Sequence, residues 1–247
     1  MTVNEITKIL EELAPLDYAE SFDNVGLLIG DAHMKVKGVL VTLDTLENVV
    51  EEAIDKNCNL IVSFHPIIFT GLKKITGKNY VEKTILKAIK NDIAIYAIHT
   101  ALDNCMTGVN AKICEKLGLT NTNILIPQKG TIKKLVTYVP IENEDHLKRE
   151  LFAAGAGKIG NYSDCSFSVA GTGSYKANEK ANPVKWTIGN IHYEKETRIS
   201  VIFSKSKEKQ VISSLLKHHP YEEVAYEIST LENTNRHIGM GMIGELV

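Results

Sequence analysis

The feature that most constrains this chain is an apolar run that ends abruptly in polar, chemically active side chains. Residues 93–98 (Ile-Ala-Ile-Tyr-Ala-Ile) are all apolar or aromatic, which is typical of a strand buried on both faces. His99 follows directly, Asp103 comes next in a predicted loop, and Gly108 precedes an amphipathic helix. This order places side chains beyond the carboxyl end of a strand, where open α/β sheets bind ligands.

A second strand signal of the same kind lies earlier in the chain. Residues 59–63 (Asn-Leu-Ile-Val-Ser) form a short, mostly apolar run, and His65 follows its end closely. If the two strands lie side by side, their carboxyl ends bring both imidazoles to one edge of the sheet. The two strand ends, each followed by a histidine, therefore favour a single shared site.

Strand and helix signals alternate three times in the first half of the chain. This alternation predicts a mostly parallel sheet with covering helices, an α/β fold. Thr45 is expected to cap the second helix. Helices are predicted over residues 3–13, around 49–54 and 81–89, and over 109–117, with strands near 27–29 and over 39–43, 60–63 and 93–98.

The pattern restarts after residues 126–130, which are predicted to form a linker. Two strand-helix-strand repeats follow, and they suggest a compact ferredoxin-like α+β domain. The elements are strands over 133–139, 165–170, 197–203 and 221–229 and helices over 143–154 and 208–217. The predicted division is thus a first domain over 1–128, an inserted domain over 131–232 and a return segment over 233–247. The return segment reads as a strand at 241–247, and we expect a continuation of it to be missing.

Composition and charge narrow the class of protein. The net charge of -2 argues against a general nucleic-acid or membrane surface. No run reaches the ~18 apolar residues of a membrane span. None of the four cysteines (Cys58, Cys105, Cys114 and Cys165) forms a C-x-x-C pair, so reduced thiols in the cytoplasm are the simplest interpretation.

The side chains at the predicted strand ends have the chemistry of a metal site. His65 and Asp103, with His99 nearby, combine the imidazole and carboxylate donors that bind zinc, manganese or iron. Asp44, at a further strand end, is a candidate acceptor that would orient a ligating histidine. The alternative is structural: His65 caps a loop, and Asp103 and Asp44 cap helices.

Two other stretches resemble sites but favour structural interpretations. Residues 217–223 contain two histidines and two glutamates, yet they join a helix to a strand, and neighbouring side chains on an extended chain point in opposite directions. Residues 155–160 are rich in glycine but lack the Gly-Lys-Ser/Thr ending of a phosphate-binding loop. We expect a turn at each place.

Several motifs, in order along nearly the whole chain, resemble the Nif-three-like family. This family is also called the GTP cyclohydrolase 1 type 2 homologue or dinuclear metal centre family. The matching stretches are residues 23–30 (Asp-Asn-Val-Gly-Leu-Leu-Ile-Gly), 63–69 (Ser-Phe-His-Pro-Ile-Ile-Phe), 99–103 (His-Thr-Ala-Leu-Asp), 155–162, 165–167, 171–173, 219–226 (His-Pro-Tyr-Glu-Glu-Val-Ala-Tyr) and 239–246.

The resemblance implies a fold, a site and an assembly. The fold is a metal-binding α/β domain interrupted by a PII-like or ferredoxin-like domain, and the assembly is a toroidal homohexamer. The site holds two divalent metal ions. His65 and Asp103 match metal ligands, and His99 matches a histidine beside the metals, to which we assign a catalytic proton transfer.

This sequence departs from the family pattern at the proposed site. The family usually has two adjacent histidines before the proline, and the first of these is Phe64 here. Because phenylalanine cannot coordinate a metal, reduced metal occupancy is expected. The family's remaining histidine and glutamate ligands lie beyond the stretch that matches this chain.

Two classes of function therefore remain open. The first is a metal-dependent hydrolase of a nucleotide-like substrate. The second is a non-catalytic oligomeric scaffold or a module that senses a small ligand. A third interpretation is that the chain is a fragment whose site an absent part completes. Phe64→His discriminates between the first two, since it restores the missing ligand.

Overall fold

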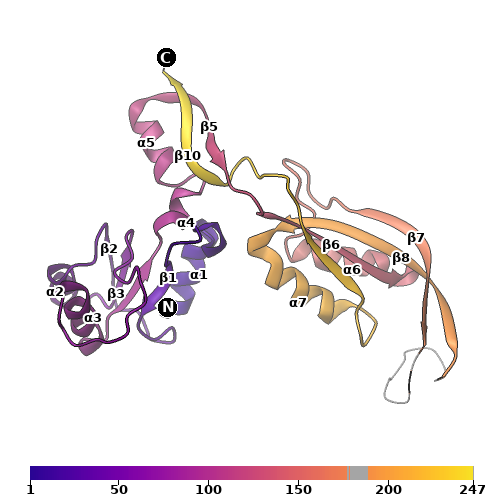
Figure 1. The fold of residues 1–247 in the computed structure, drawn as a ribbon, viewed down its shortest axis with the longest axis horizontal. Helices are drawn as coiled ribbons and strands as arrows, with labels where there is room; N and C mark the ends of the chain where they lie inside the picture. The colour runs from indigo at the N-terminus through magenta and orange to yellow at the C-terminus, as the bar shows by residue number, and fades with distance from the viewer. Residues whose placement is uncertain (177, 179–188, 247) are drawn as a thin grey trace. The chain divides into compact units, whose positions relative to one another are not determined.

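A computed structural model describes residues 1–176, 178 and 189–246 of the chain. The chain divides into two compact units. The first unit comprises Met1–Gln128 and the segment from Arg236 onward, and the second comprises Lys129–Asn235. The first unit therefore contains both ends of the chain, with the second inserted between its parts (Figure 1).

The first unit is built on a four-stranded sheet. Its strands are β1 (Gly26–Ile29), β2 (Val39–Thr42), β3 (Leu60–Ser63) and β4 (Ala94–Ala97), in the order β1-β4-β3-β2. β2, β3 and β4 run parallel, and β1 pairs with β4 antiparallel. The predicted mixed α/β architecture is confirmed.

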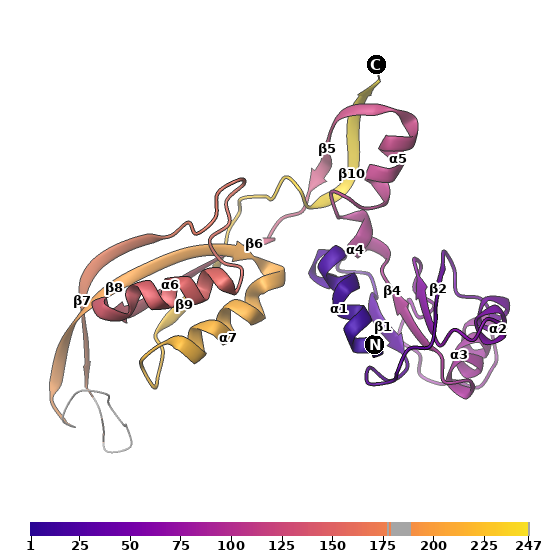
Figure 2. The ribbon, with the colours of Figure 1, turned by 180° about the vertical axis from the view of Figure 1, so that it is seen from behind.

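Helices cover both faces of this sheet, as Figure 2 shows. α1 (Val3–Leu13) packs on one face, while α2 (Glu47–Asp55) and α3 (Tyr80–Lys90) pack on the other. Successive strand residues point to opposite faces, so β3 and β4 contribute apolar side chains to a core on each face of the sheet. One core contains Val3, Leu60, Val62, Ala94 and Tyr96, and the other contains Val50, Ile61, Ile85, Ala88 and Ile95.

The start of α1 follows its sequence signals, whereas the start of α2 does not. Thr2 and Glu5 form a capping box at α1, with the Thr2 N–H donating to the Glu5 carboxylate (2.8 Å). The prediction that Thr45 caps α2 is wrong. Leu46 occupies the cap position without a side-chain hydrogen bond, and the buried Thr45 hydroxyl has no hydrogen-bond partner within the described residues.

The chain beyond β4 differs from the predicted loop and linker. Asp103 lies not in a loop but at the end of a short helix, α4 (His99–Asp103). α5 (Val109–Leu117) follows, and Gly118 ends it in the left-handed conformation, as the sequence predicts. Residues 126–127, expected in a linker, belong to a strand, β5 (Leu119–Pro127).

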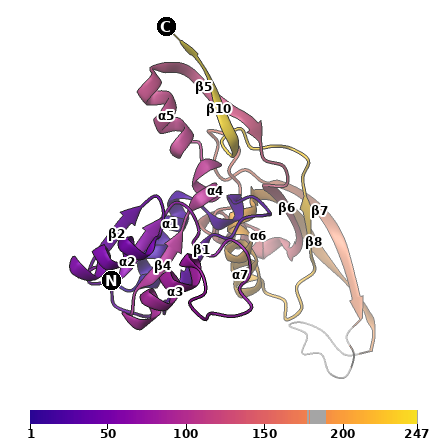
Figure 3. The ribbon, with the colours of Figure 1, turned by 60° about the vertical axis from the view of Figure 1, so that its left-hand side comes forward.

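β5 pairs antiparallel with β10 (Gly239–Leu246), which confirms a strand in the return segment. α5 lies alongside this two-stranded ribbon (Figure 3). The sequence did not predict β5 because its first half is polar and its pairing partner comes only after the whole inserted unit. Between α1 and β1, a short 3-10 helix spans Leu16–Tyr18.

The second unit is a four-stranded antiparallel sheet with two helices. In chain order the elements are β6 (Ile132–Pro140), α6 (Glu144–Ala153), β7 (Phe167–Lys176), β8 (Ile191–Ser204), α7 (Glu208–His218) and β9 (Tyr226–Thr230), with 3-10 turns at Ile141–Asn143 and Lys205–Lys207. The strand order is β7-β8-β6-β9. β9 begins five residues later than the predicted 221–229, and β8 begins six residues before the predicted 197.

The core of the second unit lies between the sheet and its helices. α6 and α7 pack side by side, and the strands β6 and β8 present every second residue to them. Leu147 and Leu151 from α6 and Val211 and Leu215 from α7 are fully buried there, against Leu135, Val139, Ile199, Val201 and Phe203.

The turn predicted at residues 217–223 begins two residues later, because residues 217–218 end α7; the connection to β9 spans 219–225, and His219 is a structural part of it. The His219 Nε2–H donates to the Tyr138 carbonyl oxygen (2.9 Å), and its Nδ1 accepts from the Tyr221 N–H (3.1 Å). Burial lowers the pKa of His219, while the Tyr138 hydrogen bond and the Glu196 charge act in the opposite direction. The buried imidazole is therefore held neutral.

This arrangement predicts an acid-sensitive second unit. Because the pKa of His219 is lowered on folding, the unfolded chain binds more protons once the pH falls below about 6.5. The stability that neutral His219 supports is therefore complete above that pH and is lost as the pH falls through the folded-state pKa. Urea denaturation at about pH 7.5 and about pH 5.5 measures the loss.

A pair of variants assigns the effect. His219→Gln is expected to weaken the pH dependence of the unfolding free energy, whereas replacing the exposed His33 by glutamine is expected to leave it unchanged. An unaltered pH dependence in His219→Gln would show that other groups cause the acid sensitivity.

Candidate functional site

The structure brings His65 and His99 together at the carboxyl ends of two neighbouring parallel strands. β3 pairs with β4 in parallel, with Ser63 opposite Ala97, so the residues after each strand lie side by side. The His99 N–H also donates to the Phe64 carbonyl oxygen (3.0 Å). As a result, the two imidazole ring centroids lie 5.4 Å apart, at an interplanar angle of 74°.

Each imidazole is paired with its own carboxylate through Nδ1. His65 Nδ1 lies 2.7 Å from Asp44 Oδ1, and His99 Nδ1 lies 2.9 Å from Asp23 Oδ1. An ionised carboxylate only accepts hydrogen bonds, so each Nδ1 carries the proton. In the neutral ring, Nε2 then keeps its lone pair, available for a metal ion or a proton. Asp44 thus accepts a hydrogen bond from a histidine, as the sequence predicts for this candidate acceptor.

Asp23 is the functional candidate that sequence reasoning missed. Its side chain has no exposed surface, and besides His99 it accepts hydrogen bonds from the Thr100 N–H (3.1 Å), the Thr100 hydroxyl and the Asn24 N–H (2.8 Å). Burial alone would raise the pKa of Asp23, but the hydrogen bonds from His99, Thr100 and Asn24 outweigh it, so the pKa is lowered. The carboxylate therefore stays ionised and fixes His99.

Strand direction explains the position of Asp23. β1 runs antiparallel to β4, and Gly26, at the start of β1, lies opposite Ala97, at the end of β4. The residues that precede β1 therefore lie beside those that follow β4. Asp23 was visible in the sequence only as part of the motif at residues 23–30, because a short strand does not reveal which way it runs.

His99 also has a strained backbone. Its φ angle is +23°, a value that residues with a side chain seldom adopt. Such strain persists only where the surroundings hold it in place, and it concentrates at functional sites. Here the holding contacts are the His99 N–H bond to Phe64 and the bond from the ring to Asp23.

Asp103, the third predicted site residue, is half-buried at the end of α4. Burial raises the pKa of its carboxyl, and Asp23 raises it further, whereas the charges of His99 and His65 lower it. The charges of both imidazoles therefore act on the Asp103 carboxyl, which lies within electrostatic range of them. Its backbone carbonyl accepts from the Asn110 side-chain amide (3.0 Å), which ties α4 to α5.

Phe64 packs edge-on against both imidazoles. Its ring centroid lies 5.0 Å from that of His65 and 5.3 Å from that of His99, both with T-shaped geometry. It also packs against the core under α1. The aromatic side chain therefore fills space beside the imidazoles and provides no donor to a cation.

The donor chemistry fits a divalent metal ion, but the donors do not form a closed site. Two imidazoles with free Nε2 atoms and one nearby carboxylate are suitable ligands. However, within residues 1–176, 178 and 189–246, no three His, Cys, Asp or Glu side chains gather closely enough to hold an ion. The cluster formed by Asp23, Asp44, His65, His99 and Asp103 is hereafter called the histidine cluster.

Comparison with known proteins identifies the family. Residues 1–246 match the model of the Duf34/NIF3 (NGG1p interacting factor 3) family. A Bacillus subtilis relative named "GTP cyclohydrolase 1 type 2 homolog" is 43% identical over 98% of this chain. A crystal structure of a Bacillus cereus protein related to NIF3 matches 99% of the chain, with 41% identity and a TM-score of 0.81. A Staphylococcus aureus protein of known structure matches at 31% identity and a TM-score of 0.68.

This chain belongs to the Duf34/NIF3 family. It spans 65% of the length of both Bacillus relatives and 64% of the Staphylococcus aureus structure. Within the described part of the chain, no helix is long and apolar enough to cross a membrane.

We expect mutation of the two carboxylate–imidazole pairs to lower the unfolding free energy by different amounts. Asp23→Ala removes a buried acceptor and leaves the His99 and Thr100 donors unpaired, so we expect a loss of about 3 kcal/mol in unfolding free energy. Asp44→Ala breaks a pair in which both side chains are about half exposed, so a loss below about 1 kcal/mol is expected. Urea denaturation of both variants measures the difference. Equal losses would contradict the anchoring role of Asp23.

Proposed function

We propose that the histidine cluster forms part of a divalent-metal site of a hydrolase that acts on a nucleotide-like substrate. The observation that carries the proposal is the pair of imidazoles, each oriented through Nδ1 by a carboxylate, with Asp103 within electrostatic range of both. The name of the Bacillus subtilis relative supports the class of reaction. The metal would be zinc, manganese or iron, since all three accept imidazole and carboxylate donors.

The roles follow from the geometry of each side chain. His65 and Asp103 would hold the ion, which supplies Lewis-acid polarisation and lowers the pKa of a bound water. His99 would move a proton at Nε2, because its hydrogen bond to Asp23 fixes the proton on Nδ1. Asp44 would orient His65 in the same way.

Phe64 supports an alternative function, a non-catalytic oligomeric scaffold or ligand-sensing module. Its ring occupies the space beside both imidazoles, where the resemblance leads us to expect a further histidine. A site with one donor fewer holds a metal more weakly. The inserted second unit would then carry the binding function.

We further infer that the second unit is of the ferredoxin-like, PII-like class. The order strand-helix-strand-strand-helix-strand and the strand order β7-β8-β6-β9 support this inference. We also propose a homohexamer, for which the exposed apolar side chains Ile191 and Tyr193, on one face of β8, would provide contact area. The four free cysteines fit a reducing cytoplasm.

Metal uptake tests the proposal directly. The purified chain is dialysed against Zn²⁺, Mn²⁺ or Fe²⁺, and the bound metal is counted by plasma mass spectrometry. We expect binding that His65→Ala abolishes, that Phe64→His strengthens at least tenfold, and that His33→Ala leaves unchanged. If neither the native chain nor Phe64→His binds metal, the proposed site is wrong.

A turnover assay distinguishes between the two proposed functions, hydrolase and scaffold. GTP serves as the probe nucleotide, and products are separated by liquid chromatography. A product that requires both bound metal and His99 supports the hydrolase. Full metal occupancy in Phe64→His without any product favours the scaffold.

A further inference from the structure

Two exposed phenylalanines lie next to each other in the first unit. Phe22 is 62% exposed and Phe69 is 50% exposed, and their ring centroids are 6.5 Å apart at an interplanar angle of 49°. Leu72 and Ile75, on the loop that follows Phe69, are exposed as well. Phenylalanine is usually buried, and apolar side chains that gather on a surface mark a place that binds a ligand or a partner. Phe22 and Phe69 are hereafter called the aromatic pair.

The aromatic pair lies on the loops that position the histidine cluster. Phe22 directly precedes Asp23, whose carboxylate contacts the His99 ring (2.9 Å). Because adjacent Cα atoms are about 3.8 Å apart, the backbone of Phe22 lies within roughly 10 Å of that imidazole. Phe69 follows His65 by four residues. The two rings are therefore within reach of a small molecule that also touches the imidazoles.

The two loops that bear the rings are fixed to each other and to the fold. The Asn24 side-chain amide donates to the Ile68 carbonyl oxygen (2.6 Å), which joins the second residue after Phe22 to the residue before Phe69. Ile67 is buried in the core that α2 and α3 cover. The aromatic pair is thus held in place before a ligand arrives, which lowers the entropy cost of binding.

The loop that follows Phe69 presents positive charge. It contains three exposed lysines, none of which forms an ion pair with another described residue: Lys73, Lys74 and Lys78. The Glu82 carboxylate accepts the Lys78 backbone N–H (3.0 Å), so this end of the loop has a fixed backbone. Unpaired ammonium groups bind phosphate. The loop therefore combines an apolar ring with cations that favour an anionic ligand.

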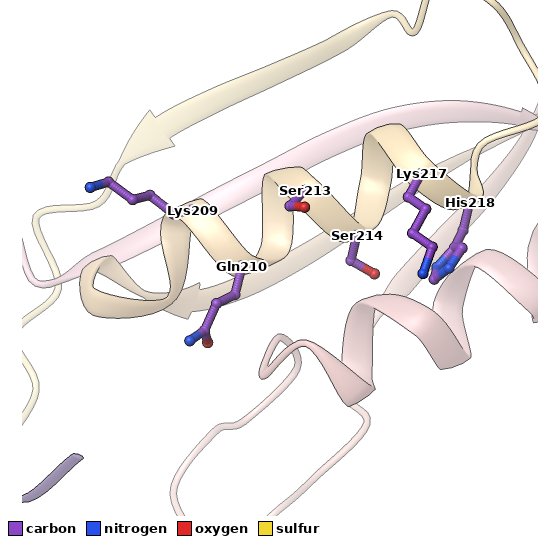
Figure 4. A pocket seen from close by; sticks show the side chains of 6 residues that line it. All are labelled: Lys209, Gln210, Ser213, Ser214, Lys217 and His218. Atoms are coloured by element: carbon purple, nitrogen blue, oxygen red, sulfur yellow. The ribbon is translucent and has the colours of Figure 1, made fainter. Parts of the chain in front are cut away.

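The second unit has an open groove of about 420 Å³ along α7, but this groove lacks a platform for a flat ring. Its lining side chains are Lys209, Gln210, Ser213, Ser214, Lys217 and His218 (Figure 4). None of these is Phe, Tyr or Trp. Figure 4 also shows that Lys209 points away from Lys217, so the two ammonium groups do not converge on one phosphate.

We propose that the aromatic pair binds the planar ring of a nucleotide by stacking, while the lysines of the same loop attract its phosphates. This inference rests on the proposed function, because it assigns the ring-binding part of the same site. A phenyl ring has no hydrogen-bond donor or acceptor with which to read a particular base, and every base has a face that stacks. The pair therefore recognises a flat heteroaromatic ring in general, and both purine and pyrimidine nucleotides are expected to bind.

Equilibrium dialysis of the full chain against GTP, UTP and inorganic triphosphate, without metal, tests the inference. Both nucleotides are expected to bind more tightly than triphosphate. Phe22→Ala and Phe69→Ala are each expected to weaken nucleotide binding about tenfold and to leave triphosphate binding unchanged. Phe22→Tyr, which keeps an aromatic ring, is expected to retain nucleotide binding.

Two matched variants in the second unit serve as controls. Phe167→Ala removes a phenylalanine that is 68% exposed, and Lys217→Gln removes a cation of the α7 groove. Both are expected to bind nucleotides like the native chain. Urea denaturation checks that each variant is folded, since replacing an exposed side chain changes stability little.

The inference is overturned if the native chain binds nucleotides no more tightly than triphosphate, or if folded Phe22→Ala and Phe69→Ala bind them like the native chain. It is also overturned if these variants change only the assembly state in size-exclusion chromatography, because the aromatic pair is then a contact between protein chains. Metal uptake and turnover are measured separately. Loss of those two activities with intact, ring-dependent nucleotide binding would contradict the hydrolase and not the aromatic pair.

Discussion

The buried Asp23 carboxylate is the interaction on which the candidate site depends. It lies at the point where the antiparallel strand β1 meets the end of β4, and it accepts hydrogen bonds from His99, Thr100 and Asn24. Because these donors offset the cost of burying a charge, the carboxylate stays ionised. The backbone of His99 can then stay in its strained conformation, and its ring keeps one tautomer.

The elements with clear periodicity could be predicted from the sequence. The buried strands β3 and β4 are short apolar runs, and His99 and His65 could be predicted as site residues because the first directly follows its run and the second lies two residues beyond its run. Asp23 could not, since only the tertiary pairing reveals that β1 runs opposite to β4. β5 was missed for a related reason: its partner, β10, lies beyond the whole second unit, and long-range pairing has no local sequence signal.

Phe64 is the position at which the candidate metal site departs from the family pattern. A histidine at this position would add a donor next to His65, whereas the phenyl ring packs against His65 and His99 and adds none. Asp44 and Asp23 still orient the two imidazoles. The ring orientation that favours metal binding is therefore retained, although one donor is absent. Membership of the Duf34/NIF3 family therefore does not by itself establish a metal site or an activity in this chain.

Anomalous X-ray diffraction from crystals soaked in Zn²⁺ tests the central claim most directly. The account predicts an anomalous peak about 2 Å from His65 Nε2 and from a carboxylate oxygen of Asp103, with both Nδ1 atoms still paired to Asp44 and Asp23. Crystals of the native chain that show no peak there, or in which Nε2 rather than Nδ1 faces the carboxylates, would contradict it.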